Sequence, residues 1–389
     1  MTEKWIPALA RYAQRLHATA GARHHVASPL GAWLVLGLVA AAEPAGDDLA
    51  EALGMEPGPA AHLARALLDK PHPLVAAASA VWYAPGRADP EPLAGWSSAL
   101  PAATEFGPLP DQAALDRWAS ERTFGLIDRF PIEITPQVVL LLASALATRL
   151  SWDVPFDVAP APTLGGAWAG QLRQVLRTPP AGHTAFVAQS RHAGEVIVHV
   201  APATDDESGA AVRVVSVAAA PDVPPDRVIA AAYEIGPDVG AATRTSLFDL
   251  PLGEGPLWTI REERAAMHSA EQVSAVLPCW SATSSHNLAA PQLGFSAAAG
   301  VLGQLLGIDP EFEAKQAAMA RFGRYGFEAA AVTGFATLTS MPAERAVRFA
   351  ELRFAHPYAV VAVTDQPGPW QGVPVFSAWV AEPEDEPEA

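Results

Sequence analysis

The chain has 389 residues, half of them apolar, and a net charge of −17. That length would ordinarily predict two domains, so a single domain would need one large sheet to organise its core. The negative charge continues into an acidic tail at 382–389, repels phosphate and argues against nucleic-acid binding. We expect this tail to be solvated and disordered.

The single cysteine, Cys279, excludes an intramolecular disulfide and a thiolate metal cluster. It stands between Pro278 and Trp280, an apolar setting that favours a buried, inert thiol over a nucleophile. Residues 1–13 lack the cationic start and apolar run of a signal peptide. The longest apolar stretch, 32–42, is shorter than the about 20 residues that cross a bilayer. We therefore expect a monomer that stays in the cytoplasm, without membrane contact.

Hydrophobic periodicity predicts an α+β chain. The helix over 30–42 is apolar on all faces, with Ser28 as N-cap and Pro29 in its first turn, so we expect it to cross the middle of a large core. Further helices are predicted, in chain order, over 9–21, 47–54 with Asp47 as N-cap, 115–127 and 288–307. Strands are predicted, in chain order, over 78–84, 138–146, 195–200 and 212–217. Four further strands, over 273–278, 316–322, 352–358 and 374–383, are expected from the family resemblance given below.

The stretch 326–334 is ambiguous by composition alone. Glu328 to Ala331 would start a helix, but Thr333 and Gly334 would end it within two turns. Read as a strand, the stretch would alternate its side chains between two faces. One face would carry Phe327, Ala329, Ala331, Thr333 and Phe335.

Several motifs resemble the serpin family, and they occur in the family's order along the chain. They are Ser28-Pro29-Leu30 continuing to 48–54, Trp118 with Thr123, Gly125 and Ile127, the run Trp152 to Phe156, Leu277-Pro278, the stretch 326–334, and the closing segments 352–358 and 374–383. Together these blocks cover roughly two thirds of the chain, and 158–271 shows the least likeness. The composition, rich in alanine, proline and arginine, is typical of a GC-rich bacterial genome.

The resemblance implies one serpin domain over 1–389, with a large central β-sheet, two smaller sheets and about eight to nine helices. An exposed C-terminal reactive loop would span about 324–350. The loop hinge would consist of Gly326, Phe327, Glu328, Ala329, Ala330, Ala331, Thr333 and Gly334. Trp152, Ser28 and Pro29 would lie at the breach and the shutter, where the sheet opens.

Serpins inhibit serine proteases as suicide substrates. The resemblance implies that a protease cuts the loop, which then inserts as a strand into the central sheet, and that no cofactor takes part. Family spacing places the scissile bond near Ser340-Met341, but the proline after Met341 disfavours a cut there. Cleavage after Ser340 or Leu338 would suit elastase-, subtilisin- or chymotrypsin-like proteases. Arg345 or Arg348 stays open as the bait for a trypsin-like enzyme.

Four residues depart from the family pattern. Phe327 stands where threonine or serine is usual, and forcing its ring into a packed sheet could cost about 1–3 kcal/mol. Arg324 replaces an acidic residue, Gln316 replaces a shutter histidine, and Gly31 replaces a serine. These departures leave open the alternative of a non-inhibitory serpin-fold protein that is cleaved as a substrate or binds a partner.

Motifs of enzyme chemistry are missing from the sequence. We find no metalloprotease helix, no phosphate-binding glycine loop and no nucleophile elbow. His24 and His25 are adjacent and would not face the same way in a helix, which argues against a metal site. The cluster 284–286 is interpreted as a polar loop, and 205–207 as a hairpin tip rather than a calcium site. A hydrolase with an unrecognised site is a third, weaker hypothesis.

Overall fold

Helix α2 (Pro29–Val39) lies in the core, as its all-apolar sequence predicts. Ten of its eleven residues are buried. The hydroxyl oxygen of Ser28 caps the helix by accepting a hydrogen bond from the backbone N–H of Gly31. Pro29 occupies the first helical position, where no N–H donor is required. The predicted start of this helix is therefore confirmed.

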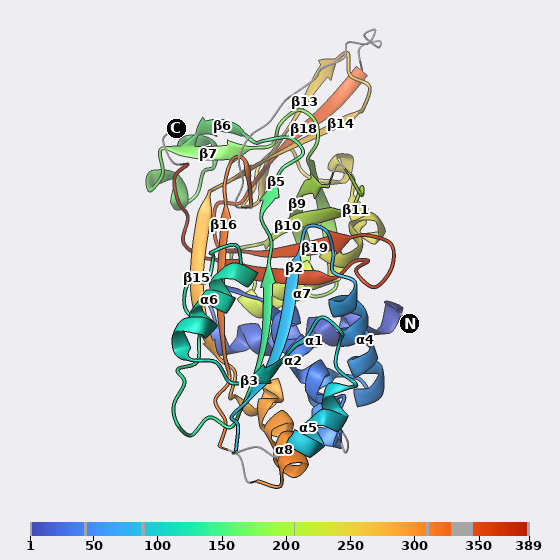
Figure 1. Ribbon diagram of the computed structural model, residues 1–389. Coiled ribbons are helices and arrows are strands. Elements are labelled where there is room, and N and C mark those ends of the chain that lie inside the picture. Colours follow the sequence, from blue (N-terminus) through green and yellow to red (C-terminus); the bar gives the residue numbers. More distant parts are fainter. Residues whose placement is uncertain are drawn as a thin grey trace.

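The structure is a computed structural model that describes residues 2–42, 45–86, 90–205, 207–308, 311–327 and 345–386. Within these ranges the α-helices are α1 (Thr2–Ala20), α2, α3 (Asp47–Leu53), α4 (Pro57–Asp69), α5 (Pro90–Ser97), α6 (Gln112–Arg122), α7 (Pro225–Ile235) and α8 (Phe295–Leu306). Helices α1, α3, α4 and α8 pack against α2 (Figure 1). None of the helices in the described ranges has the length and apolar character needed to span a lipid bilayer.

The strands of the described residues form four hydrogen-bonded ladders. The seven-stranded ladder contains, in spatial order, β1 (His25–Ala27), β20 (Pro374–Val380), β19 (Tyr358–Asp365), β10 (Ala211–Ala219), β9 (Gly194–Thr204), β8 (Thr184–Ser190) and β11 (Thr243–Thr245). The six-stranded ladder contains β12 (Gly253–Glu254), β13 (Trp258–Ala265), β18 (Arg345–Arg353), β14 (Glu271–Leu277), β7 (Gln174–Arg177) and β6 (Asp157–Pro160). The four-stranded ladder is β15 (Trp280–Asn287), β16 (Lys315–Phe322), β17 (Gly326–Phe327) and β5 (Leu150–Ser151), and the three-stranded one is β3 (Glu105–Pro108), β2 (Ala76–Tyr83) and β4 (Leu140–Ala147).

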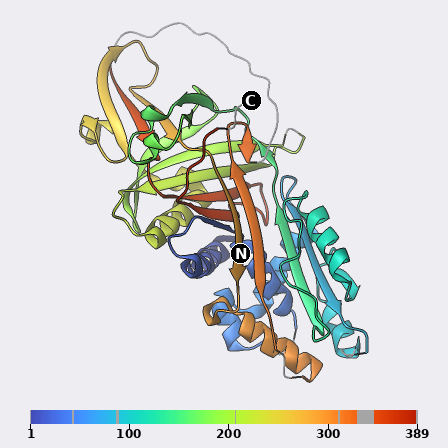
Figure 2. The same ribbon diagram turned by 90° about the vertical axis from the view of Figure 1, so that its left-hand side faces the viewer.

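The two smaller ladders together make up the large central sheet that the resemblance implies. Strand β4 leads after two residues into β5, so one segment of chain, 140–151, belongs to both ladders. Strand β17 is antiparallel to both β5 and β16, and these two strands therefore run in the same direction. No ladder joins β4 to β16 in the described part of the chain, so the sheet has two halves that meet only at β17 (Figure 2).

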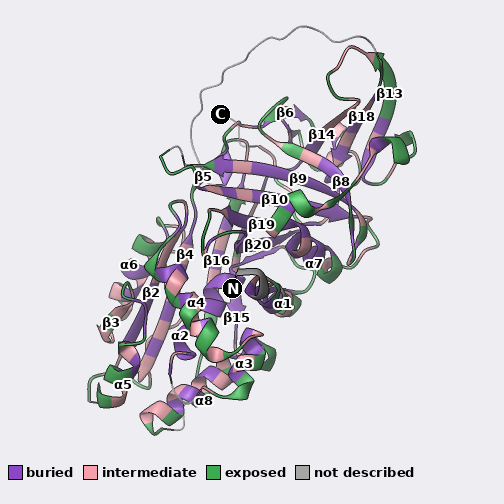
Figure 3. Ribbon diagram, turned by 90° about the vertical axis from the view of Figure 1, so that its right-hand side faces the viewer, coloured by how far each residue is buried: buried purple, intermediate pink, exposed green. Residues whose placement is uncertain are grey.

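The two faces of β4 pack against different parts of the molecule. Buried and half-buried residues alternate along the strand (Figure 3). Its odd-numbered residues from 141 to 145 cluster with Trp118 of α6. Leu142 and Leu146, on the other face, pack against the core that contains α2. The central sheet thus lies between α6 on the outside and α2 on the inside.

The region 158–271, which sequence alone could not align, contains β6 to β13 and α7. The predicted strands 195–200 and 212–217 lie in β9 and β10, which pair with each other. At their connection the carboxylate of Asp205 accepts a hydrogen bond from the backbone N–H of Ser208, as expected of a hairpin tip.

Several predicted helix boundaries need correction: α1 already begins at Thr2, α2 ends at Val39 and α8 begins only at Phe295. The helix expected over 115–127 ends at Arg122, because Phe124 and Gly125 adopt φ angles of 55° and 78°, a left-handed conformation that terminates a helix. Asp47 is the first residue of α3 and not its N-cap, since the preceding glycine takes that position. All of these corrections concern the ends of helices, where local backbone conformation outweighs residue preference.

The acidic tail is placed in the structure as far as Glu386, contrary to the predicted disorder of 382–389. The backbone N–H of Glu384 donates a 2.7 Å hydrogen bond to the carbonyl of Cys279. The carboxylate of Asp385 accepts hydrogen bonds from the backbone N–H groups of Arg173, at 2.6 Å, and Gln174, at 3.1 Å. The prediction treated these carboxylates as solvated, whereas the Asp385 carboxylate is hydrogen-bonded to backbone N–H groups. Residues 387–389 lie outside the described residues.

Candidate functional site

The predicted hinge begins in strand β17, inside the central sheet. Phe327 pairs with Phe322 of β16 on one side and with Leu150 of β5 on the other, and Gly326 pairs with Ser151. Both pairings are antiparallel, so β17 runs opposite to its two neighbours. The first two hinge residues therefore already occupy a strand position between the halves of the sheet.

The remaining loop predictions lie outside the described residues. These are the hinge residues Glu328, Ala329, Ala330, Ala331, Thr333 and Gly334, and the scissile-bond candidates Leu338, Ser340 and Met341. The chain is described again from Arg345, where β18 begins. Seventeen residues, 328–344, thus separate the hinge strand from the next described strand.

A cavity of about 220 Å³ lies between β4 and β16 and is lined at one end by Phe327. Residues 140–146 of β4 and 315–321 of β16 line its two sides. Gly31 of α2 lines it toward the core, and Trp118 of α6 lines it on the opposite face. The cavity follows two parallel strands whose facing edges have no ladder partner among the described residues.

Trp152 anchors the turn that leads from β16 into β17. Its indole N–H donates a 3.0 Å hydrogen bond to the carbonyl of Gly323, and its backbone N–H donates a 3.1 Å bond to the carbonyl of Tyr325. Phe156 adds two bonds with Arg324: its backbone N–H donates to the Arg324 carbonyl, and its carbonyl accepts from the Arg324 Nε–H. Four hydrogen bonds therefore fix this turn to the segment that follows β5.

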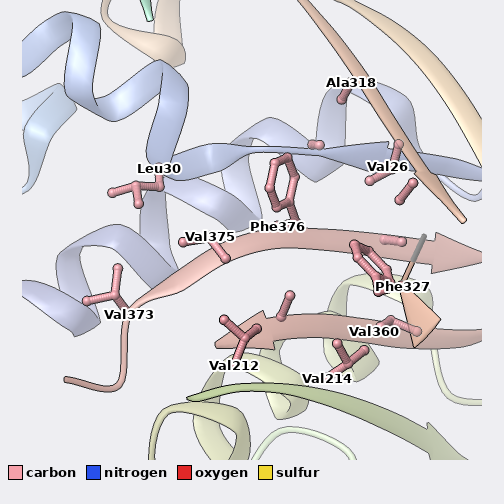
Figure 4. Close-up of a cluster of buried hydrophobic side chains, with 14 of the residues drawn as sticks. Val26, Leu30, Val212, Val214, Ala318, Phe327, Val360, Val373, Val375 and Phe376 are labelled. Atoms are coloured by element: carbon pink, nitrogen blue, oxygen red, sulfur yellow. The ribbon is translucent and has the colours of Figure 1, made fainter. Parts of the chain in front are cut away.

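Phe327 fits into an aromatic cluster at the head of the cavity. The residue is 5% exposed, and its ring lies 6.2 Å from that of Trp280, which stacks on Phe322 at 6.0 Å. Figure 4 shows its side chain in the same buried cluster as Val360 and Phe376. The free-energy cost expected for placing the Phe327 ring in the sheet is thus offset by its contacts with neighbouring aromatic rings, which the sequence did not predict.

Gln316, which replaces the usual shutter histidine, ties β16 to the start of α2. Its side-chain oxygen accepts a 2.9 Å hydrogen bond from the backbone N–H of Ser28, and its amide nitrogen donates a 2.8 Å bond to the Ser28 carbonyl. On β4, the hydroxyl of Ser144 donates a 2.7 Å bond to the carbonyl of Gly31. Each of the two strands is therefore hydrogen-bonded to the start of α2.

Thr148, between β4 and β5, presents a buried hydroxyl group that lacks a partner among the described residues. The residue is 3% exposed and lines the cavity. A buried hydroxyl without a hydrogen bond is unfavourable, by roughly 1–3 kcal/mol, and such groups usually mark a missing partner. A backbone N–H or carbonyl group entering the cavity would supply that partner.

Comparison with known proteins identifies this architecture. Sequence comparison finds no matching family model and no matching curated protein. Structural comparison finds the native state of tengpin, a thermophilic serpin, with a TM-score of 0.64 at 15% identity, covering 98% of this chain and 95% of tengpin. The chain has the serpin fold.

Two further structures illustrate the range of proteins that share this serpin fold. Serpin48 from the insect Tenebrio molitor matches with a TM-score of 0.58 at 13% identity and covers 97% of this chain and 98% of Serpin48. Thyroxine-binding globulin in complex with thyroxine matches with a TM-score of 0.61 at 14% identity, covering 98% and 100%. At these identities the comparisons establish the fold, and the activity needs its own argument.

The position of β18 corrects the predicted bounds of the serpin reactive loop and one of the bait hypotheses. Residues 345–350, assigned to the loop by sequence, pair in β18 with β13 and β14. Arg348 lies inside this strand, donates to the carbonyls of Leu247 and Leu250 and forms a 2.9 Å ion pair with Glu262. A side chain held in this way is not accessible as protease bait, and Arg345 is likewise paired at the start of the strand.

Cys279 is a buried thiol, as the sequence predicts, and His24 is hydrogen-bonded to two neighbouring segments. Burial, with a further contribution from the Glu386 carboxylate, raises the pKa of the Cys279 thiol well above its usual range, so the thiol stays protonated and inert. His24 donates a hydrogen bond to the carbonyl of Ser281 and accepts one from the backbone N–H of Ala381. In the described ranges, no group of three or more histidine, cysteine or acidic side chains is arranged to hold a metal ion.

The cluster 284–286 is a strand segment, not the polar loop that the sequence suggested. It lies in β15 and pairs with β16. The hydroxyl of Ser284 accepts a hydrogen bond from the backbone N–H of Val26, and His286 donates one to the Val26 carbonyl. These side chains join β15 to β1. The sequence did not reveal the strand because residues 284–286 are all polar.

A buried chain of hydrogen bonds escaped the sequence analysis altogether. All groups are satisfied when both histidine rings carry their proton on Nδ1. Tyr233 O–H then donates to the Ser377 hydroxyl at 2.8 Å, and Ser377 O–H donates to His17 Nε2 at 2.7 Å. His17 Nδ1–H donates to His25 Nε2 at 2.7 Å, and His25 Nδ1–H donates to the Arg23 carbonyl at 2.7 Å. Ser377 and His17 are only 4% and 3% exposed, so this pair has no access to a substrate. Since they are 360 residues apart, no local signal could have revealed the contact.

The buried hydrogen-bond network of Tyr233, Ser377, His17 and His25 predicts that acid destabilises the protein. With neutral rings every nitrogen is already bonded, and burial lowers the pKa of His25 to about 4 and that of His17 well below its usual value. Below pH 6.5 the unfolded state binds protons that the folded state excludes, so stability falls as the pH drops from about 6.5 towards 4. His25 alone would contribute about 3 kcal/mol over that window.

Urea unfolding between pH 7 and pH 4.5 measures this effect. His25→Gln should flatten the dependence of the unfolding free energy on pH, whereas His62→Gln, at an exposed surface position, should leave the slope unchanged. An equal slope in wild type and His25→Gln would show that the buried ring does not govern the acid response.

Proposed function

We propose that this protein is a serpin-type inhibitor of serine proteases, with elastase-, subtilisin- or chymotrypsin-like enzymes as its targets. A protease would cleave the segment 328–344, and the residues after Phe327 would then enter the cavity as a new strand between β4 and β16. The observation that carries the proposal is β17, where Gly326 and Phe327 are already paired with both flanking strands at the head of the cavity.

Continuing the pairing of β17 gives the register of the inserted strand. In an antiparallel ladder each step forward on one strand is a step back on its neighbour. From Phe327 opposite Phe322, Ala329 would lie opposite Ala320 and Ala331 opposite Ala318. Ala318 and Ala320 are both buried, so the face that would turn toward the core carries small residues on both strands. This match supports insertion without steric conflict.

The same register brings polar groups together further along. Thr333 would lie opposite Gln316 on β16 and, by extension from the pairing of Phe327 with Leu150, opposite Ser144 on β4. These are the polar side chains that line this part of the cavity. Ala329 would pass Thr148, whose hydroxyl lacks a partner. Polar residues would therefore meet polar neighbours, and apolar residues apolar ones.

Insertion should stabilise the cleaved protein. A strand of eight residues paired on both edges would form roughly ten hydrogen bonds, each worth about 1 kcal/mol. Even with part of this gain lost to ordering the segment, we expect the Tm of the cleaved form to exceed that of the intact form by about 10 °C or more.

Trapping of a protease tests the proposed function. The protein is incubated with subtilisin-, elastase-, chymotrypsin- and trypsin-like enzymes, and the products are separated by denaturing electrophoresis. An inhibitor of this type forms a covalent complex that survives denaturation with at least one of the first three classes. N-terminal sequencing of the released peptide locates the cut, which we place after Leu338 or Ser340. Cleavage by all four classes without any stable complex contradicts inhibition.

A non-inhibitory binding protein is the second candidate. Thyroxine-binding globulin, which shares the fold, is described in complex with thyroxine. The departures at Gly31 and Gln316 alter the shutter, where an inhibitory member must open. Such a protein would be cut without forming a complex and without gaining stability, so the two measurements above separate the candidates.

A further inference from the structure

The C-terminal tail contacts the turn that leads into the hinge strand. This turn, 323–325, connects β16 to β17. The carboxylate of Glu386 accepts a 3.3 Å hydrogen bond from the backbone N–H of Arg324. The same carboxylate oxygen also lies near Gly323, since a Cβ atom placed on that glycine would lie 3.9 Å from it. The turn is thus held by the tail as well as by Trp152.

The position of Glu386 is fixed by neighbouring contacts with Cys279, just before β15, and with the start of β15. The thiol of Cys279 donates a 2.9 Å hydrogen bond to the Glu386 oxygen that also binds the turn. Two residues earlier, Glu384 forms a β-bridge with Cys279 and accepts a 2.6 Å hydrogen bond from the hydroxyl of Ser281. The buried thiol therefore serves as a hydrogen-bond donor to the tail.

Asp385 joins the tail to a second ladder. Its carboxylate accepts two hydrogen bonds from backbone N–H groups at the start of β7 and forms a 3.4 Å ion pair with Arg173 (Figure 1 shows β6 and β7 at this end of the molecule). Bonds from backbone N–H to a carboxylate are charge-assisted and stronger than neutral ones. The tail consequently connects three parts of the molecule. Glu384 and Glu386 contact the start of β15 and the hinge turn, and Asp385 between them contacts the start of β7.

We propose that Glu386 is a positioning residue for the hinge. By holding Arg324 it keeps the turn closed, so that Gly326 and Phe327 stay paired between β5 and β16 in the register from which the strand can extend. The anchoring itself depends only on the contacts above. Its consequence for inhibition rests on the proposed function, because a held hinge affects trapping only if the segment after Phe327 inserts.

Hydrogen exchange of the backbone amides tests the anchoring without any protease. Removal of one charge-assisted bond in Glu386→Ala should speed exchange of the amides in 323–327 by about 10-fold. Amides of β9 and β10, far from the tail, should exchange as in wild type. Glu386→Gln keeps an acceptor oxygen at the same place and should restore most of the protection.

Glu382→Ala is the matched control, since it removes the same charge from an exposed position in the same tail. Equal exchange of 323–327 in Glu386→Ala and Glu382→Ala overturns the proposal, as does uniform acceleration across β9 and β10, which would indicate general destabilisation. The proposed function is judged separately, by the Tm of cleaved wild-type protein. In an inhibitory protein, Glu386→Ala should also raise the number of molecules cleaved per protease trapped, and Glu386→Gln should not.

Discussion

On the proposed function, replacing Ala331 by glutamate should convert the protein from a protease inhibitor into a protease substrate. In the inserted strand Ala331 would lie opposite the buried Ala318 and face the core. A carboxylate there would lose its hydration without gaining a partner, which costs several kcal/mol. Insertion would stall, and the number of molecules cleaved per protease trapped should rise by at least about 10-fold.

The control for this variant is Ala330→Glu. Its side chain would point to the opposite face, between buried Ala147 of β4 and half-buried Met319 of β16, with exposed Arg321 nearby. A carboxylate there would keep more contact with water and with a positive charge than one at Ala331. We expect near wild-type trapping and a near wild-type gain in Tm on cleavage. If Ala331→Glu traps protease as well as Ala330→Glu does, the register derived from β17 is wrong.

Truncating Trp152 to alanine should loosen the hinge and destabilise the fold. The indole is 3% exposed, packs 5.3 Å from the ring of Phe322 and donates the hydrogen bond to Gly323. Loss of a buried aromatic side chain typically costs about 3–5 kcal/mol. Trp152→Phe keeps a ring but removes the N–H donor and should cost about 1–3 kcal/mol.

Urea unfolding gives both values, and amide exchange of 323–327 shows whether the turn opens. In Trp152→Ala the exchange of this turn should increase more than that of α2, which lies elsewhere in the core. The truncation is expected to cost well over about 1 kcal/mol. If the unfolding free energy of Trp152→Ala is within that margin of the wild-type value, the tail and Phe156 hold the turn without help from the indole.

The parts of the fold that sequence predicted are those with strong local patterns. Helix α2 follows from an unbroken apolar run with a serine cap, and β4 follows from a nearly continuous apolar run. Strand β16 was expected from its position before the hinge in the family resemblance. The hinge was located because 326–334 resembles a family motif, and its first two residues are found as a strand. Local signals of this kind need no knowledge of distant contacts.

The features that sequence missed depend on residues far apart in the chain. The separation of β4 from β16 concerns segments with about 170 intervening residues, and neither segment alone reveals an open edge. The tail contacts of Glu386 with Cys279 join positions 107 residues apart. Arg348 stayed open as bait because the segment up to Arg353 is longer than in many serpins, whereas pairing with β13 and β14 places it inside a sheet. Such outcomes follow from tertiary pairing, which overrides local composition.

The most direct measurement is amide hydrogen exchange of β4 and β16 before and after a single cut within 328–344. In the intact protein the edges of these strands that face the cavity have no ladder partner in the described residues, and their amides should exchange readily. After cleavage, we predict that alternate amides in both 140–147 and 315–322 become protected as the new strand pairs with them. Unchanged exchange in both strands after complete cleavage would contradict insertion at this site.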